Sequence, residues 1–169
     1  MNKFKIGKKI ISDNKPTYFI ADIGANHDGS LEKAKELIYL CAESGADAAK
    51  FQHFSAKTIV SDFGFKSLKG KFSHQSKWKK SVFEVYQDAS INLNWTNSLK
   101  KTCKRVGIEF FSSPYSYEMV NHLNPFVSTF KIGSGDITWL DYLEFISKKN
   151  KPIILATGAS TLKEVKLAT

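Results

Sequence analysis

The sequence contains little cysteine and no long apolar run. Its 169 residues include only two cysteines, Cys41 and Cys103, which are too few for a disulfide-stabilised scaffold and fit a reducing compartment. No apolar run approaches the roughly 20 residues that are needed to span a bilayer. The N-terminus, residues 1–5, lacks the apolar stretch of a secretion signal. We therefore expect a cytoplasmic protein without a membrane partner.

The composition indicates a folded, basic protein. Hydrophobic residues make up 42% of the chain and charged residues 24%, so the chain can bury a core. The 25 lysines and arginines exceed the 16 acidic residues by nine, which favours anionic partners such as nucleic acid, acidic lipid or a phosphorylated small molecule. Because the basic residues are spread over helix faces and one loop, without a recognised nucleic-acid module, we expect no nucleic-acid partner.

Short apolar runs alternate with segments of helical periodicity. Strands are expected at 18–23, 48–51, 108–111, 130–132 and 153–156. Helices are expected from Leu31 to Gly45 with Ser30 as N-cap, from Trp95 to Gly107, over 116–123 and 140–146, and from Thr161 onward. The Lys-rich stretch from Ser61 to Lys80 is expected to be irregular. This order is typical of a parallel sheet covered by helices.

Two architectures fit this order. An open doubly wound sheet usually carries a G-x-G-x-x-G loop after its first strand, and Gly24 to Gly29 does not match it. The alternative is a (β/α)8 TIM-type barrel, which needs roughly 250 residues, so about five of its strand–helix units are present here. We expect residues 1–16 to form an N-terminal hairpin at the bottom of the barrel. Residues 17–169 are then a truncated part of the catalytic barrel.

Polar residues follow the expected strands where a barrel carries its active site, because the carboxyl ends of parallel strands meet at one rim. The candidates are Asp22, Asn26, His27, Lys50, Gln52, Ser112, Ser113, Lys131, Ser134, Asp136 and Thr157. Lys50 and Gln52 share one strand face, while Phe51 points toward the helices. Lys131 is likewise flanked by apolar residues. Two buried lysines on separate strands are expected to converge on an anion, with Ser134 and its flanking glycines adding phosphate-binding groups.

Each of these features also has a purely structural interpretation. Asp22 could simply be the ion-pair partner of a strand lysine, and Gly133 to Gly135 could be an ordinary turn. Residues 26–29 could be a turn and helix cap. We interpret His53, His74 and His122 as surface or core residues. The lysines between 66 and 80 form a solvated loop or attract an anionic substrate; they are Lys66, Lys69, Lys71, Lys77, Lys79 and Lys80.

Five ordered blocks of the chain resemble the sialic acid (N-acetylneuraminate) synthase family. They are IADIGANHDG at 20–29, GADAAKFQ at 45–52, FSSPY at 111–115, FKIGSGD at 130–136 and KPIILATG at 151–158. The resemblance implies a (β/α)8 barrel followed by a small antifreeze-like domain, which is absent here. It also implies condensation of phosphoenolpyruvate with an N-acylated amino sugar, giving phosphate and a nine-carbon 2-keto acid. The sugar could be N-acetylmannosamine, its 6-phosphate, or a legionaminic or pseudaminic acid precursor.

The resemblance also implies roles for individual residues. Lys50, Lys131 and Ser134 would hold phosphoenolpyruvate with help from Ser113, and Gln52 would contact the sugar. Asp22 would act near the carbon that water attacks, while Asp136, Thr157 and Asn26 are further substrate-binding candidates. The family commonly has Glu at positions 22 and 136, often Thr at 113 and Ser at 156. Asp22, Asp136, Ser113 and Ala156 therefore suggest a subgroup with a different sugar or altered activity.

The resemblance further implies a divalent metal, Mn2+ or Mg2+, and a homodimer for the full-length protein. The family's two metal-binding histidines lie on later strands, beyond residue 169, so we expect no metal site in this chain and an inactive fragment. A non-catalytic remnant that binds phosphoenolpyruvate or the sugar is the alternative. In calorimetry of the isolated chain, phosphoenolpyruvate binding without turnover favours a remnant or fragment, whereas no binding at all favours misfolding.

Overall fold

The computed structural model describes residues 3–67 and 78–169 and has alternating strands and helices. The strands are β1 (Phe4–Ile6), β2 (Lys9–Ile11), β3 (Ile20–Gly24), β4 (Ala48–His53), β5 (Glu109–Pro114), β6 (Phe130–Ile132) and β7 (Ile153–Leu155). The helices are α1 (Leu31–Glu43), α2 (Ala56–Ile59), α3 (Asp62–Ser67), α4 (Val82–Ala89), α5 (Thr96–Val106), α6 (Tyr117–Leu123), α7 (Leu140–Ser147) and α8 (Leu162–Ala168). Short 3-10 turns, η2 (Leu93–Trp95) and η3 (Ser134–Asp136), precede α5 and follow β6.

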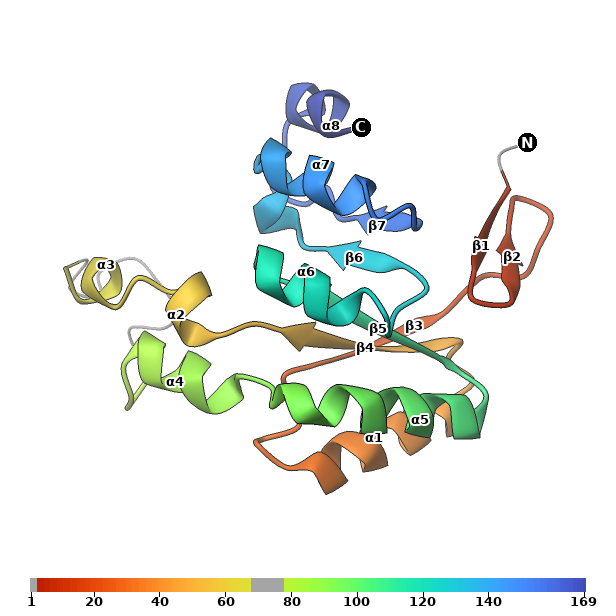
Figure 1. Ribbon diagram of the computed structural model, residues 1–169, viewed down its shortest axis with the longest axis horizontal. Coiled ribbons are helices and arrows are strands. Elements are labelled where there is room, and N and C mark those ends of the chain that lie inside the picture. The colour runs from red at the N-terminus through yellow and green to blue at the C-terminus, as the bar shows by residue number, and fades with distance from the viewer. Residues whose placement is uncertain (1–2, 68–77) are drawn as a thin grey trace.

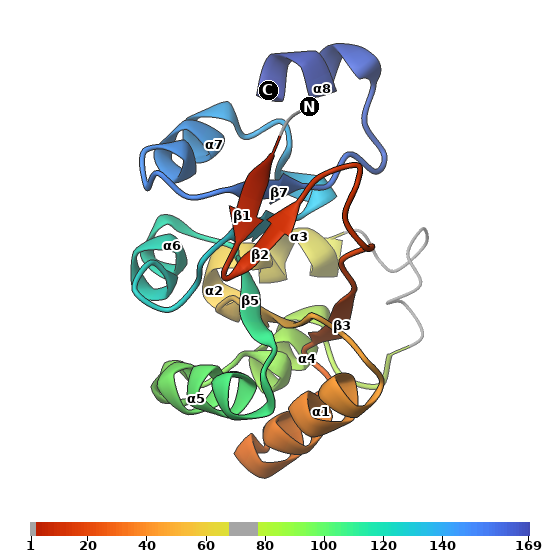
Figure 2. The same cartoon turned by 90° about the vertical axis from the view of Figure 1, so that its right-hand side faces the viewer.

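Strands β3 to β7 follow one another as parallel neighbours. The β3–β4–β5 sheet and the β6–β7 pair are each hydrogen-bonded in parallel register, and β6 lies beside β5. Figure 1 shows β4 and β6 pointing the same way, and Figure 2 shows α5, α6 and α7 along one side of the strands. Sequential parallel strands joined by helices are the units of a (β/α) barrel, and the doubly wound alternative does not apply.

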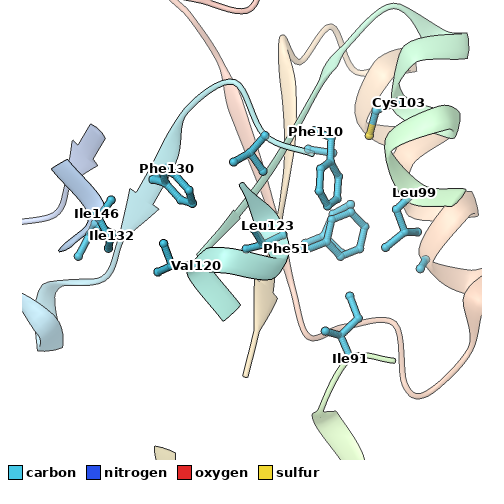
Figure 3. Packing of buried hydrophobic residues seen from close by; sticks show 14 of the residues in the cluster. Phe51, Ile91, Leu99, Cys103, Phe110, Val120, Leu123, Phe130, Ile132 and Ile146 are labelled. Atoms are coloured by element: carbon cyan, nitrogen blue, oxygen red, sulfur yellow. The ribbon is translucent and has the colours of Figure 1, made fainter. Parts of the chain in front are cut away.

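Alternate residues of the strands point to opposite faces of the sheet. Phe51, Phe110, Phe130 and Ile132 point outward into the main core beneath α1, α5, α6 and α7 (Figure 3). The residues between them on the strands, such as Phe111 and Ile154, belong to a second cluster on the opposite face. We call this opposite face the inner face of the sheet. The predicted alternation around Phe51 and Lys131 is therefore observed.

The helix boundaries follow local sequence signals. The Ser30 hydroxyl accepts a hydrogen bond from the Lys33 N–H, which caps the first turn of α1. Gly107 closes α5 with φ of 81°, a left-handed conformation that costs glycine little. Thr161 and Glu164 form a reciprocal capping box at the start of α8. Each of these ends lies where the sequence predicts it.

The N-terminal hairpin covers one end of the strands. Strands β1 and β2 pair antiparallel around a turn at Gly7, where φ is 56°. Ile6 is buried against Ala48, the first residue of β4, and against Phe111. Figure 2, which looks at this end of the molecule, shows the hairpin in front of the strands. The apolar side of the hairpin therefore closes the amino-terminal end of the inner face, opposite the expected active-site rim.

The expectation of an irregular stretch over 61–80 is wrong in its first part. Residues 62–67 form α3, and α2 and α4, which were also not predicted, lie on either side. Ser81 and Glu84 make a capping box at the start of α4, a signal that the sequence did contain. Lys66 pairs with Asp62 on α3 and Lys80 with Asp88, while Lys69, Lys71, Lys77 and His74 lie outside the described residues. Within the described ranges, no helix combines the length and apolarity that a bilayer crossing requires.

A buried histidine joins β4 to α5 and α6. His53 is fully buried, and its Nδ1 lies 2.7 Å from the Ser112 hydroxyl while its Nε2 lies 3.0 Å from the Thr96 hydroxyl. The Thr96 hydroxyl donates to the Leu93 carbonyl, so it accepts a hydrogen bond from His53 and another from His122. This arrangement fits a neutral His53 with its proton on Nε2. The interpretation of His53 as a core residue is confirmed.

We expect the protein to lose stability in acid through His53. Burial lowers the pKa of His53 to about 3, with His122 and His27 adding to the effect, whereas an unfolded histidine titrates near 6.5. Between these values the unfolded chain binds more protons, so the free energy of unfolding falls as pH decreases, by about 1.4 kcal/mol per pH unit. Urea denaturation between pH 7 and pH 5 measures this slope. His53→Gln should reduce it, and an unchanged slope would contradict the assignment.

Candidate active site

The polar residues of β3, β4 and β5 meet on the inner face because of the strand register. Asp22 on β3 lies opposite Lys50 on β4, and Gln52 on β4 lies opposite Ser113 on β5. All four occupy positions that alternate with outward-pointing core residues. The parallel register therefore gathers side chains that are far apart in sequence on one patch near the carboxyl ends of the strands.

Lys50 and Asp22 form an ion pair on this patch. The Lys50 Nζ lies 2.7 Å from Asp22 Oδ1, and the exposed fractions of the two side chains are 10% and 62%. The ammonium group is therefore buried among protein atoms while the carboxylate opens to solvent. A buried ammonium group needs a charged partner, and Asp22 supplies it. The structural interpretation of Asp22 as the partner of Lys50 is thus correct as a description of the contact.

Lys131 on β6 faces the same patch. Burial lowers the pKa of its ammonium group and the nearby Lys50 ammonium lowers it further, whereas the carboxylates of Asp22 and Asp136 act in the opposite direction. The Lys131 Nζ donates a hydrogen bond of 2.6 Å to the Ile132 carbonyl. Four charged groups, from three strands and the turn after β6, therefore lie in one site; they are Asp22, Lys50, Lys131 and Asp136. The two ammonium groups repel each other, so an anion between them would relieve the repulsion.

The segment after β6 forms one edge of this site. Residues 134–136 form η3, so the Gly133 to Gly135 segment is indeed a turn. Asp136 Oδ2 is buried without a hydrogen-bond partner, and burial raises the pKa of this carboxyl while Lys131 lowers it. The Ser134 hydroxyl lies 3.5 Å from the position that a Cβ on Gly158 would take, so η3 packs against the loop after β7. Thr157 is exposed in that loop.

Asn26 lies in the turn that follows β3. It is exposed in the turn after β3, where its N–H donates to the Ile23 carbonyl, as the structural interpretation of residues 26–29 expects. The buried side chain of this turn is His27, whose Nδ1 accepts a hydrogen bond of 3.1 Å from the Gly29 N–H. Its ring packs edge-on against Trp95 at 5.7 Å between centroids. The turn is therefore anchored by the buried His27, while Asn26 is exposed.

Tyr115 is a site residue that sequence reasoning missed. It follows β5 directly, and its hydroxyl accepts a hydrogen bond of 3.3 Å from the Gln52 amide. The same hydroxyl lies 3.6 Å from the position of a Cβ on Gly133, which itself lies 3.4 Å from Asp136 Oδ2. Tyr115 therefore stands between the β4 side of the patch and the turn after β6. Its place at the end of the FSSPY block was the available signal.

The described residues do not by themselves make a metal site. Within 3–67 and 78–169, no three His, Cys, Asp or Glu side chains gather in a way that would hold a metal ion. The Asp22 carboxylate is paired with the Lys50 ammonium group, and the Lys131 ammonium group acts on the Asp136 carboxyl. These positive charges offset the negative charge that a metal cation would need. We therefore assign no chemical step to a metal held by this chain.

The fold and the patch together define a class of protein: part of a (β/α)8 barrel with a lysine-lined site at the carboxyl ends of its strands. Comparison with known proteins narrows this class. The NeuB family model matches residues 37–169, and the chain belongs to this family. The recognition made from the five sequence blocks is therefore confirmed.

Several relatives are synthases of acidic sugars. The chain is 40% identical over 156 residues to N,N'-diacetyllegionaminic acid synthase of Campylobacter jejuni, covering 91% of this chain and 46% of the relative. It is 32% identical to human N-acetylneuraminate-9-phosphate synthase, covering 89% and 42%. The crystal structure of the Leptospira borgpetersenii N-acetylneuraminic acid synthetase superposes with a TM-score of 0.81 at 25% identity, covering 99% of this chain and 53% of that one. The chain thus spans less than half the length of these curated relatives.

Proposed function

We propose that this chain supplies the phosphoenolpyruvate-binding part of a cytoplasmic synthase that condenses phosphoenolpyruvate with an N-acylated amino sugar. The products are a nine-carbon 2-keto sugar acid and phosphate. One observation carries the proposal. Lys50 on β4 and Lys131 on β6 both lie on the inner face, on the two strands that flank β5, and Lys50 is near enough to lower the pKa of the Lys131 ammonium group. Family membership supports the proposal, because two relatives are named N,N'-diacetyllegionaminic acid synthase and N-acetylneuraminate-9-phosphate synthase.

The residues of the patch suit the steps of this reaction. Lys50 and Lys131 neutralise the phosphate and carboxylate charges of phosphoenolpyruvate and fix its orientation, with Ser134 and Ser113 as hydroxyl donors. C3 of the enol then bonds to the aldehyde carbon of the sugar while positive charge develops at C2. Water adds at C2, and the phosphate leaves with its bridging oxygen. The carboxylate of Asp22, which is exposed beside Lys50, would stabilise that charge or orient the water.

The sugar side of the proposal rests on Gln52 and its neighbours, with Asp136, Thr157 and Asn26 as further binding candidates. For the whole enzyme the proposal includes a divalent metal, Mn2+ or Mg2+, held by residues outside this chain, and a homodimer. The two free thiols, Cys41 and Cys103, suit a reducing cytoplasm. The alternative proposal is a remnant that binds phosphoenolpyruvate without turnover, since Asp22 and Asp136 are one methylene shorter than the glutamates common in the family.

The test is an assay of the full-length protein with phosphoenolpyruvate, Mn2+ and a panel of acylated amino sugars. The panel contains N-acetylmannosamine, its 6-phosphate, and legionaminic and pseudaminic acid precursors. Phosphate release with one of these sugars, together with a 2-keto acid product by mass spectrometry, is the expected result. Folded protein that binds phosphoenolpyruvate in calorimetry but releases no phosphate with any sugar would favour the remnant. Folded protein that does neither would contradict both proposals.

Asp22→Asn separates the two roles of this carboxylate. We expect kcat to fall about 100-fold, because the amide can no longer stabilise positive charge or take a proton from water. We expect KM for phosphoenolpyruvate to stay the same or decrease, because the amide oxygen still accepts a hydrogen bond from Lys50 while the competing negative charge is gone. Steady-state kinetics measures both values. A raised KM with unchanged kcat would mean that Asp22 only positions Lys50.

A further inference from the structure

The Tyr115 hydroxyl is surrounded by groups that donate to it. The Gln52 amide donates a hydrogen bond of 3.3 Å to the phenol oxygen. The pKa of Tyr115 is raised by burial and by the carboxylates of Asp136 and Asp22, whereas the Ser113 hydroxyl lowers it by acting as a donor toward the same oxygen. The phenol is therefore neutral, and its proton remains available to an acceptor. Among the described residues, Asp136 Oδ2 does not take it, since that oxygen has no hydrogen-bond partner.

The surroundings of Tyr115 suit an uncharged, amphipathic ligand better than an anion. The carboxylates of Asp136 and Asp22 face it and would repel a phosphate or carboxylate group. Its ring packs edge-on against Phe54 at 6.1 Å between centroids, and Phe54 in turn packs against Tyr86 of α4 at 5.6 Å. Figure 1 shows α4 beyond the carboxyl end of β4, on the same side as the candidate site. This side of the patch thus combines an aromatic wall with a neutral donor.

We propose that the Tyr115 hydroxyl donates a hydrogen bond to the N-acyl carbonyl oxygen of the amino-sugar substrate, and so selects acylated amino sugars over the corresponding plain hexoses. This inference rests on the proposed function. The carbonyl oxygen is a strong uncharged hydrogen-bond acceptor. The apolar acyl carbon beside it would pack against the aromatic rings next to Tyr115. The anionic substrate lies on the other side of the patch, at Lys50 and Lys131. Tyr115 is in this view a specificity-determining residue.

The experiment compares wild type and Tyr115→Phe in the full-length enzyme, with N-acylated amino sugar and with the corresponding hexose that lacks the acylamino group. The Phe variant keeps the ring that packs on Phe54, and an unchanged thermal melting temperature checks that it folds. We expect KM for the acylated sugar to rise about 10-fold, the usual effect of one lost hydrogen bond to a neutral group. KM for phosphoenolpyruvate and kcat/KM for the plain hexose should stay unchanged.

The matched control is Tyr117→Phe, since Tyr117 is an exposed tyrosine of α6 that packs with Trp139 and Phe145 on the outer side. It should leave KM for the acylated sugar, KM for phosphoenolpyruvate and kcat/KM for the plain hexose unchanged. Equal losses for both sugars in Tyr115→Phe, a raised KM for phosphoenolpyruvate, or no change at all would overturn the Tyr115 assignment while the enzyme activity stands. A folded wild type that uses no acylated sugar with phosphoenolpyruvate would instead overturn the proposed function, and the Tyr115 assignment with it.

Discussion

Replacing Lys50 with methionine in the full-length enzyme is expected to lower kcat/KM for phosphoenolpyruvate about 1000-fold. The substitution removes a buried ammonium group, and it also leaves the Asp22 carboxylate facing the anionic substrate without its partner. Truncating one member of a buried charge pair typically costs about 2–5 kcal/mol, and about 4 kcal/mol corresponds to a factor of 1000. Steady-state kinetics with phosphoenolpyruvate as the varied substrate measures the effect.

Two further variants test this explanation. Lys148→Met breaks an exposed ion pair with Glu144 on α7, where the two atoms are 2.6 Å apart, and should leave the kinetics unchanged. The double variant Lys50→Met with Asp22→Asn removes the uncompensated carboxylate. Calorimetry should therefore show tighter phosphoenolpyruvate binding in the double variant than in Lys50→Met alone. Equal binding would mean that Asp22 does not face the phosphoenolpyruvate site.

The inner and outer faces of the strands were predictable because alternation is a local property. Phe51 lies between Lys50 and Gln52 in sequence, so any strand at this position sends the lysine and the phenylalanine to opposite faces. The helix ends were predictable for the same reason, because Ser30, Gly107 and Thr161 act on backbone groups within four residues. Each of these signals lies within the element that it determines.

The missing parts of the prediction depend on contacts between distant residues. No local pattern states that the Gln52 amide reaches Tyr115, because that contact requires the register between β4 and β5. The same holds for His53, whose ring nitrogens meet the hydroxyls of Ser112 and Thr96 from two other elements. Helix α4 is a different case. Its capping box at Ser81 and Glu84 was legible, but no helix was predicted there, directly after the lysine-rich stretch 61–80.

The ion pair between Lys50 and Asp22 shows why the functional and structural interpretations of one residue need not exclude each other. A lysine that is buried on an inner strand face must have a countercharge when no ligand is present, or its charged form becomes unfavourable. Asp22 supplies that charge while its own side chain stays largely exposed. The carboxylate can therefore neutralise Lys50 before the substrate binds and act on water afterwards. A carboxylate buried on both sides could do only the first.

Lys131→Met is the variant with the other largest expected effect, a loss of about 1000-fold in kcat/KM for phosphoenolpyruvate, because the substitution removes the cation that would form a buried charge pair with the bound anion. Its effect on stability should be opposite to that of a structural residue. Folding lowers the pKa of Lys131 through burial and through the Lys50 ammonium, so the folded state disfavours its positive charge. Removing that charge should leave the thermal melting temperature unchanged or raise it, because the repulsion from Lys50 disappears.

Loss of substrate binding without loss of stability would show that Lys131 binds the ligand and does not stabilise the fold. Isothermal calorimetry with phosphoenolpyruvate and a thermal melt of the same preparation measure the two quantities. Lys100→Met is the matched control, because the Lys100 ammonium also donates to a backbone carbonyl, that of Pro125 at 3.1 Å, but from the outer helix α5. It should bind phosphoenolpyruvate like wild type. A Lys131→Met protein that melts several degrees lower and still binds phosphoenolpyruvate would show that Lys131 is a structural lysine. A different cationic group would then have to bind the anion together with Lys50.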